Sequence, residues 1–309
     1  MNNMSNRNQE INDAISKLES FKADPAYAKD AYAIDENIIF LKSIKNIFSY
    51  IGWLIKRPKM IAPERLLELT DFPVEAWDLK MHRRLIDVER NKHIGVGKPL
   101  VDKILAYVES EDRPLTLVNL GAGGMEVDRQ VIAALLEKKY SRPLVIIGVD
   151  KSRTTQKIAK ENLGSLGNGV NVIERDRLTR GELDAIKAVN AGITVILCGN
   201  DIFGLDKEFP AGSFDLIYHS IFKHHLPSDT RPCLDELMKK LSRTAYEYDG
   251  FRTWQVIVPL TVVAWNYPFF LGAVVFSNIR FDKEPVVKAR AGARILSFHK
   301  NTGHYLLEL

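Results

Sequence analysis

The fold is decided by the stretch Leu117-Val118-Asn119-Leu120-Gly121-Ala122-Gly123-Gly124, in which a largely apolar strand runs directly into a glycine-rich loop. Residues 127–138 follow with a helical pattern. Glycine permits the tight turn and, because it lacks a side chain, lets a ligand approach the backbone closely. The stretch therefore predicts a strand, a loop and a helix of an α/β fold, with a ligand at the loop.

A carboxylate ends the next predicted strand. This strand covers residues 144–149, and Asp150 follows it directly. A carboxylate at such a strand end can accept hydrogen bonds from both hydroxyls of a ribose. Together with Gly121 and Gly123, Asp150 indicates a cofactor that contains a nucleoside.

Strand-like and helix-like blocks alternate from about residue 111 onward. The strand candidates are residues 115–120, 144–149, 170–173, 193–197, 214–218 and 254–263. This alternation is typical of a doubly wound, mostly parallel sheet with crossover helices. At the end of the chain, Asn301-Thr302-Gly303 separates residues 293–299 from 304–309, which predicts an antiparallel hairpin.

Residues 1–110 have a different pattern, with apolar positions three and four apart that predict helices throughout. A first, weak helix covers residues 8–21, and residues 38–55 place one apolar set on a single helix face. That set is Phe40, Ile44, Ile47, Phe48, Ile51, Leu54 and Ile55. We therefore expect a helical region at 1–110 and an α/β domain at 111–309.

Composition excludes several classes of protein. The 309 residues are 46% hydrophobic and 27% charged with a net charge of +4, which is ordinary for a globular chain and too mild to indicate nucleic-acid binding. The two cysteines, Cys198 and Cys233, form no CxxC pair, so neither a disulfide framework nor a metal site is expected. The polar first twenty or so residues lack the apolar core of a signal peptide, which predicts a cytoplasmic protein.

Residues 212–227 read Gly-Ser-Phe-Asp-Leu-Ile-Tyr-His-Ser-Ile-Phe-Lys-His-His-Leu-Pro. With the glycine loop and Asp150, this segment resembles the class I S-adenosylmethionine-dependent methyltransferases, whose fourth strand often reads Phe-Asp-Leu-(Ile/Val) and leads to Ser-x-x-x-His-His-Leu-Pro. The resemblance covers residues 80–309. It implies a Rossmann-like, seven-stranded sheet, the cofactor S-adenosyl-L-methionine and methyl transfer as the reaction.

The resemblance also implies where the cofactor binds. Gly121 and Gly123 would lie against its methionine part and Asp150 on its ribose hydroxyls. The full implied set is Asn119, Gly121, Ala122, Gly123, Asp150, Asn200, Asp201, Ile202 and Ser220. The chain departs from the family pattern twice: Asn119 replaces the usual acid, and Met125 the usual third glycine.

Two acids compete for the position beside the adenine. Asp176 follows the candidate strand at 170–173, and Asp201 follows the one at 193–197. We favour Asp201, because 193–197 is the stronger apolar run and lies at the shorter spacing from residue 214. Residues 176–190 would then form an inserted helix.

Methyl transfer from a sulfonium is an in-line displacement, so the protein mainly aligns the acceptor and excludes water. His219, His224 and His225 lie at or after the end of the predicted strand 214–218 and are the candidate bases. Residues 254–277 carry no charge, which favours a small-molecule acceptor over nucleic acid. The aromatic segment at 265–270 either lines the acceptor pocket or packs a helix onto the sheet.

The amino-terminal apolar face must be buried against something. Residues 38–59 also carry five cations and no acid: Lys42, Lys45, Lys56, Arg57 and Lys59. The face could cover the acceptor pocket as a lid, as the resemblance favours, contact a second subunit, or make a peripheral contact with an anionic membrane. The oligomeric state is left open.

Two other functions stay open. Gly121, Gly123 and Asp150 would also suit the ribose and pyrophosphate of NAD(P) in an oxidoreductase, although no tyrosine is followed by a lysine four residues later. The substitutions at Asn119 and Met125 are also compatible with a non-catalytic scaffold whose amino-terminal helix binds a membrane or a partner.

Overall fold

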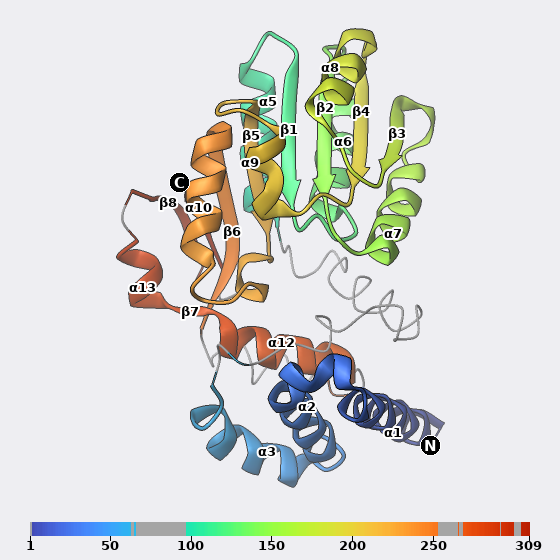
Figure 1. Cartoon of the computed structure of the whole chain (residues 1–309), viewed down its shortest axis with the longest axis vertical. Helices are drawn as coiled ribbons and strands as arrows, with labels where there is room; N and C mark the ends of the chain where they lie inside the picture. The colour runs from blue at the N-terminus through green and yellow to red at the C-terminus, as the bar shows by residue number, and fades with distance from the viewer. Residues whose placement is uncertain are drawn as a thin grey trace. The chain divides into compact units, whose positions relative to one another are not determined.

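A computed structural model of the chain describes residues 2–62, 65, 97–252, 265, 268–290, 292–299 and 304–309 (Figure 1). Within these ranges, no helix is long and apolar enough to cross a lipid bilayer.

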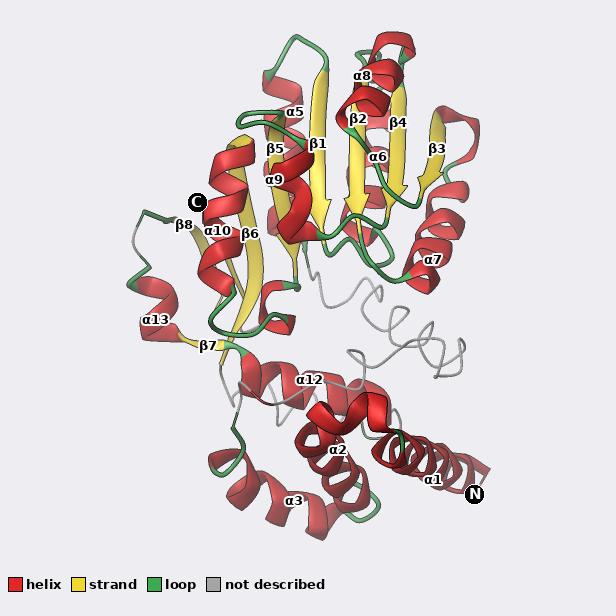
Figure 2. Cartoon of the chain, viewed as in Figure 1, coloured by secondary structure: helices red, strands yellow, loops and turns green. Residues whose placement is uncertain are grey.

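A mostly parallel sheet forms the centre of the α/β part (Figure 2). Its strands are β1 Leu115–Leu120, β2 Leu144–Val149, β3 Val170–Arg175, β4 Ile193–Cys198, β5 Phe214–Ser220, β6 Ser242–Arg252, β8 Arg294–His299 and β9 His304–Glu308. They lie in the order β3-β4-β2-β1-β5-β6-β9-β8, and the short β7, Asp282–Lys283, pairs with the end of β6. Strands β1 to β6 pair in parallel, whereas β8 and β9 form the expected antiparallel hairpin.

Helices cover both faces of this sheet, because the apolar residues of each strand alternate between two buried layers. One layer packs under α5 Lys98–Ser110, α6 Glu126–Glu137 and α7 Arg153–Gly164. The other packs under α8 Arg180–Val189, α9 Leu205–Glu208 and α10 Arg231–Leu241. The doubly wound α/β prediction is confirmed, and α8 is the helix expected within 176–190. Among the described residues the sheet holds nine strands instead of the seven that the resemblance implies: β3 lies at the edge outside β4, and β7 pairs with β6 off the main order.

The strand beside β5 is β6, which none of the predicted strands covers. We had expected that strand at residues 254–263, which lie outside the described residues. Residues 246–249 of β6 alternate tyrosine with acid, so one face is aromatic and the other is charged. A buried parallel strand is expected to be apolar on both sides. Because one face of β6 is charged, its sequence does not have the apolar pattern that predicts such a strand.

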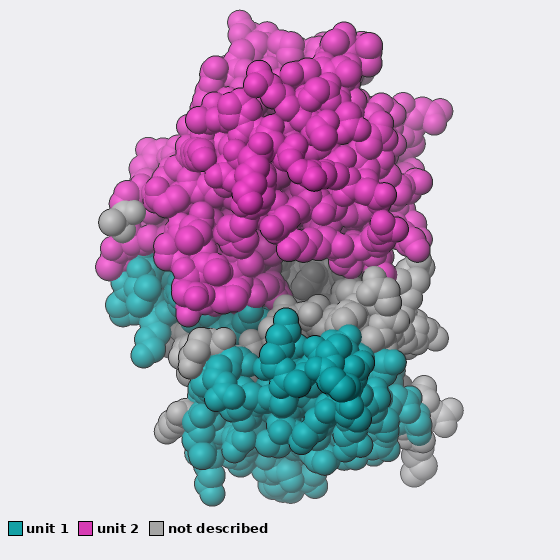
Figure 3. Space-filling view, viewed as in Figure 1, with its two compact units in different colours: residues 1–88, 250–287, 300–303 teal, residues 89–249, 288–299, 304–309 magenta. Residues whose placement is uncertain are grey.

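The chain divides into two compact units (Figure 3). The helical unit comprises residues 1–88, 250–287 and 300–303, and the sheet unit comprises 89–249, 288–299 and 304–309. This division differs from the boundary expected near residue 110. Helix α5 belongs to the sheet unit because Leu100, Val101 and Ile104 are buried in the core of the sheet. Residues Pro268–Arg280, near the carboxyl terminus, form a helix that belongs to the helical unit because apolar side chains on it are buried in that unit's core.

The helical unit is built from α1 Asn2–Ala23, α2 Ala31–Ser43, α3 Ile47–Lys56 and α12 Pro268–Arg280, with short turns η1 Pro25–Asp30 and η2 Arg57–Lys59 and the five-residue helix α13 Glu284–Lys288 at its boundary. Aromatic rings hold its core together. The Phe40 ring centroid lies 5.1 Å from that of Trp53 and 5.1 Å from that of Phe276. Trp265 joins the same cluster, and the Arg7 guanidinium lies 4.5 Å from its ring centroid. Trp265 therefore packs in the core of the helical unit, whereas we had expected segment 265–270 either to line the acceptor pocket or to pack a helix onto the sheet.

The single helix face expected over residues 38–55 is broken. Helix α2 ends at Ser43, and α3 begins after Asn46, whose side chain accepts hydrogen bonds from the amides of Phe48 and Ser49. Asparagine caps a helix start well because it satisfies amides that have no partner within the helix. The cap starts a new helix with a new orientation, so Phe40 and Ile44 are buried whereas Phe48 is exposed.

Candidate cofactor and acid-base site

The glycine loop joins β1 to α6. Gly121 and Gly123 have φ of +63° and +50°, the left-handed region that favours glycine. A Cβ atom at Gly121 would overlap the Phe222 ring, whereas one at Gly123 would meet no atom within 4 Å. Gly121 therefore lets the segment after β5 pack against the loop, and open space lies beside Gly123.

Asp150 lies next to that open space. The Gly123 amide donates a hydrogen bond to Asp150 Oδ2 at 2.8 Å, and the Ser152 amide donates one to Oδ1 at 2.8 Å. The carboxylate is half-buried, and each of its oxygens keeps capacity to accept a further bond. The structure thus brings Gly123 and Asp150 together.

Asn119, which replaces the family's acid, contacts a carboxylate instead. Its Nδ2 donates to Asp128 Oδ2 at 2.6 Å, and the Tyr218 hydroxyl donates to the other oxygen of Asp128. All three side chains are buried, and burial raises the pKa of both Asp128 and Tyr218. A carboxylate from α6 therefore lies beneath the loop although β1 carries none.

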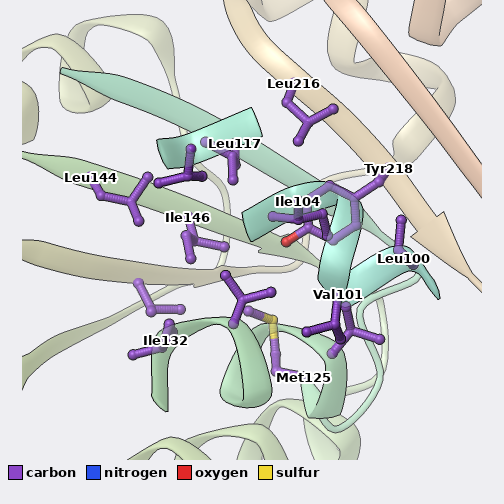
Figure 4. Close-up of a cluster of buried hydrophobic side chains, with 14 of the residues drawn as sticks. Leu100, Val101, Ile104, Leu117, Met125, Ile132, Leu144, Ile146, Leu216 and Tyr218 are labelled. Atoms are coloured by element: carbon purple, nitrogen blue, oxygen red, sulfur yellow. The ribbon is translucent and has the colours of Figure 1, made fainter. Parts of the chain in front are cut away.

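Met125, which replaces the third glycine, lies in the core of the sheet unit. It has φ of +55° and is fully buried beneath the loop among the side chains of Figure 4, which include Leu117, Ile132 and Ile146. A Cβ atom at Gly148 of β2 would overlap the Met125 sulfur, so the two residues fit each other. The substitution fills the core and leaves the space beside Gly123 open.

The two acids proposed for the adenine both lie on exposed loops. Asp201 accepts an ion pair from Lys151 at 2.9 Å, and Lys151 directly follows Asp150. Asp176 accepts one from Arg153 at 3.0 Å. Strand β4, which precedes Asp201, lies between β2 and the edge strand β3. The loop that carries Asp201 therefore follows the strand next to that of Asp150.

The remaining residues predicted to bind the cofactor make contacts within the protein at the ends of strands. Asn200 Oδ1 accepts from the Leu178 amide at 2.8 Å, and its Nδ2 donates to the Leu178 carbonyl at 3.0 Å. Ile202 is buried in the layer under α10. The Ala122 amide donates to the Val149 carbonyl at 3.1 Å, and Ser220, half-buried, ends β5. The side chains of Asn200 and Ile202 are thus engaged within the protein.

The three histidines have different surroundings. His219 on β5 is fully buried, with Nε2 3.5 Å from Glu247 Oε2. His224, in the short turn η8 Lys223–His225, is buried with Nδ1 2.8 Å from Asp249 Oδ1. His225 is partly exposed, and its ring centroid lies 4.1 Å from that of His224. Asp249 therefore fixes the His224 ring, and His225 is the most accessible of the three.

A buried charge network around β6 was missed from the sequence. Lys223 Nζ lies 2.6 Å from Asp235 Oδ1 and 3.2 Å from Glu247 Oε2, and Arg290 pairs with both carboxylates. The Tyr305 hydroxyl donates to Glu247 at 2.6 Å.

The two carboxylates of this network are shifted in opposite directions. Burial, with the nearby Glu247 charge, raises the pKa of Asp235 to about 6. Burial also opposes ionisation of Glu247, but His219, Lys223 and Tyr305 together lower its pKa. The alternation of tyrosine and acid over residues 246–249 is the sequence signal that could have revealed this strand and its carboxylates.

Among the described residues, no group of histidine, cysteine and acid side chains is arranged to hold a metal ion.

No family model and no curated protein sequence matches the chain. Solved structures are similar to it. They include the magnesium protoporphyrin IX methyltransferase ChlM of Synechocystis PCC 6803 with bound SAH, at 13% identity and a TM-score of 0.43 over 74% of this chain and 92% of that one. The CurJ carbon methyltransferase has 10% identity and a TM-score of 0.46, over 95% of this chain and 69% of that one. The plantazolicin methyltransferase BamL, also with SAH, has 13% identity and a TM-score of 0.43 over 74% and 88%. Each is a methyltransferase, the family that the sequence motifs resemble.

Proposed function

We propose that the chain is an S-adenosylmethionine-dependent methyltransferase that acts on a small-molecule acceptor. The observation that carries this proposal is the hydrogen bond from the Gly123 amide to Asp150, which joins the glycine loop after β1 to the acid after β2. The open space at Gly123 and the free acceptor capacity of Asp150 fit a ribose-containing cofactor. The segment 212–227 supports methyl transfer over hydride transfer, since it resembles the methyltransferase motif.

The bound cofactor would supply a methyl group on a sulfonium. For its part, the chain would bind and orient it: Gly121 and Gly123 allow backbone contact with the methionine part, and Asp150 accepts bonds from the ribose hydroxyls. Asp201 follows β4, which lies two strands away from β1 and its glycine loop, and it is paired with Lys151. We propose that it lies at the adenine. Alignment of acceptor and methyl group is the main catalytic requirement.

An acceptor with a hydroxyl or a protonated amine must also lose a proton. His224 is proposed as the base, because it follows β5 and its Nδ1 lies 2.8 Å from Asp249 Oδ1, which fixes the ring. His225, beside it and partly exposed, is the alternative base. His219 is buried against Glu247, so its proposed role is to position β5 rather than to touch the acceptor.

Calorimetry with S-adenosylhomocysteine and with NAD tests the proposal. The wild-type chain is expected to bind S-adenosylhomocysteine and not NAD. Asp150→Ala should weaken that binding by about ten- to a hundredfold, since charge-assisted hydrogen bonds contribute about 1.5–3 kcal/mol. Binding of NAD alone would establish the oxidoreductase alternative, and no binding of either would favour the scaffold. Unchanged affinity in a folded Asp150→Ala protein would refute the site.

A further inference from the structure

Helix α3 carries an apolar face that is exposed in the described part of the chain. Its exposed fractions are 42% for Ile47, 80% for Phe48, 46% for Ile51 and 61% for Ile55. The opposite face buries Tyr50 and Trp53 in the aromatic core of the helical unit. Helix α3 lies at the edge of that group of helices (Figure 1). Large apolar side chains gathered on one exposed helix face indicate an interaction surface.

The break before α3 explains why this face is outside. The Asn46 cap ends the path of α2 and starts α3 in a new orientation. Tyr50 and Trp53, three residues apart, then turn inward. Ile47, Ile51 and Ile55, each four apart, consequently form a stripe on the outside together with Phe48.

Positively charged residues flank this stripe in the sequence. Residues 37–63 contain five lysine or arginine residues and no acid. Lys42, Lys45 and Lys56 are exposed, whereas Arg57 is paired with Glu36 at 2.6 Å. An apolar face flanked by lysines is typical of helices that lie in a membrane interface. Two copies of this chain meeting through α3 would instead bring the same lysines face to face, which is unfavourable.

We propose that α3 docks on the surface of an anionic lipid bilayer. Ile47, Phe48, Ile51 and Ile55 enter the boundary between headgroups and acyl chains, and Lys45 and Lys56 contact lipid phosphates. A ten-residue helix is too short to span the bilayer, so it lies in the plane of the surface. This inference is independent of the proposed methyl transfer.

Cosedimentation of the full chain with lipid vesicles tests the docking. We compare vesicles of phosphatidylcholine alone with equimolar phosphatidylcholine and phosphatidylglycerol. The chain is expected to pellet with the anionic vesicles, and less so at high salt because screening weakens the lysine contacts. Each exposed lysine should strengthen binding by about fivefold.

Two matched double variants separate α3 from general surface hydrophobicity. Phe48→Ser with Ile55→Ser should weaken vesicle binding by at least about tenfold, since binding scales with the buried apolar area. Val189→Ser with Val286→Ser removes side chains that are 83% and 57% exposed elsewhere and should bind like wild type. All four positions are exposed, so both variants are expected to keep the wild-type circular dichroism spectrum.

Three results would overturn the proposal: no pelleting of the wild type with anionic vesicles, equal binding by the Phe48→Ser/Ile55→Ser variant, or equal losses in both double variants. Sedimentation velocity provides the other check. A wild-type dimer that Phe48→Ser/Ile55→Ser dissociates, with no vesicle binding, would assign the face to a second copy of the chain.

Discussion

Gly121 and Gly123 share the left-handed backbone conformation, yet their surroundings differ. At Gly121 a side chain would collide with the ring of Phe222, a residue of the segment after β5. At Gly123 a side chain would enter open space beside Asp150. Packing against Phe222 thus restricts a side chain at Gly121, whereas only the backbone conformation does so at Gly123.

Alanine at each glycine should have a different effect. Gly121→Ala adds a clash to the backbone strain, so the free energy of unfolding should fall by about 2–5 kcal/mol. Gly123→Ala adds strain alone, about 1–2 kcal/mol, but its methyl group occupies the ligand space. Urea unfolding followed by circular dichroism, with calorimetry on the folded variants, measures both effects. Equal destabilisation by the two variants would contradict this account.

Asp201 and Asp176 offer a second matched pair. Each makes one exposed ion pair, with Lys151 and with Arg153, so neither substitution should change stability by more than about 1 kcal/mol. Asp201→Ala is expected to weaken binding of S-adenosylhomocysteine, and Asp176→Ala to leave it near the wild-type value. The reverse result in calorimetry would assign the adenine to the loop after β3.

Elements far apart in the sequence meet in the charge network of the sheet unit. Lys223 follows β5, Asp235 lies on α10 and Glu247 on β6. Buried carboxylates are costly unless cations and donors compensate them, and Arg290 and Tyr305 do so from the carboxyl-terminal segment. The network therefore links α10, β6 and the terminal hairpin.

This network predicts a pH dependence of stability. The pKa of Asp235 is about 6 in the folded chain, above the ordinary value of about 3.9. Between about pH 4 and 6 the folded state thus keeps a proton that the unfolded state has released, so stability falls as pH rises, by up to about 3 kcal/mol from this group. Asp235→Asn cannot ionise and should lose less stability over that window.

Urea unfolding at about pH 4.5 and about pH 6.5 measures the difference. Glu236→Gln is the control, because Glu236 is an exposed neighbour on the same helix. If the free energy of unfolding of Asp235→Asn changes between the two pH values as much as that of the wild type and of Glu236→Gln, Asp235 does not keep its proton in the folded state.

The helical unit combines both ends of the sequence. Helix α12 contributes Leu271, Val275, Phe276 and Ile279 to the same core as α1, α2 and α3. Residues 1–60 are therefore part of a folded core and cannot be treated as a detachable segment.

Deletion of residues 1–60 should expose these four side chains of α12, each of which gains about 1.5–3 kcal/mol from burial. The shortened chain is expected to bind a hydrophobic dye such as ANS and to self-associate. Phe48→Ser with Ile55→Ser should do neither, because it changes only exposed positions. A monomeric deletion protein without dye binding would disprove the shared core.

The sequence by itself determined the elements whose signals are local. Strands β1 and β2 were predicted with the observed bounds, because each is a short apolar run that ends in a glycine or an acid. The loop glycines and Asp150 were recognisable for the same reason, since backbone freedom and a strand-end carboxylate are read from a few neighbouring residues.

Only the tertiary structure decided the features that depend on distant partners. Strand β6 carries Glu247 and Asp249, which could be buried because Lys223, Arg290, Tyr305 and His224 meet them from elsewhere in the chain. The outward face of α3 likewise depends on which side of the helix packs against Phe40 and Phe276. Burial of charge and the orientation of a short helix are properties of the surrounding core, and a local pattern does not contain them.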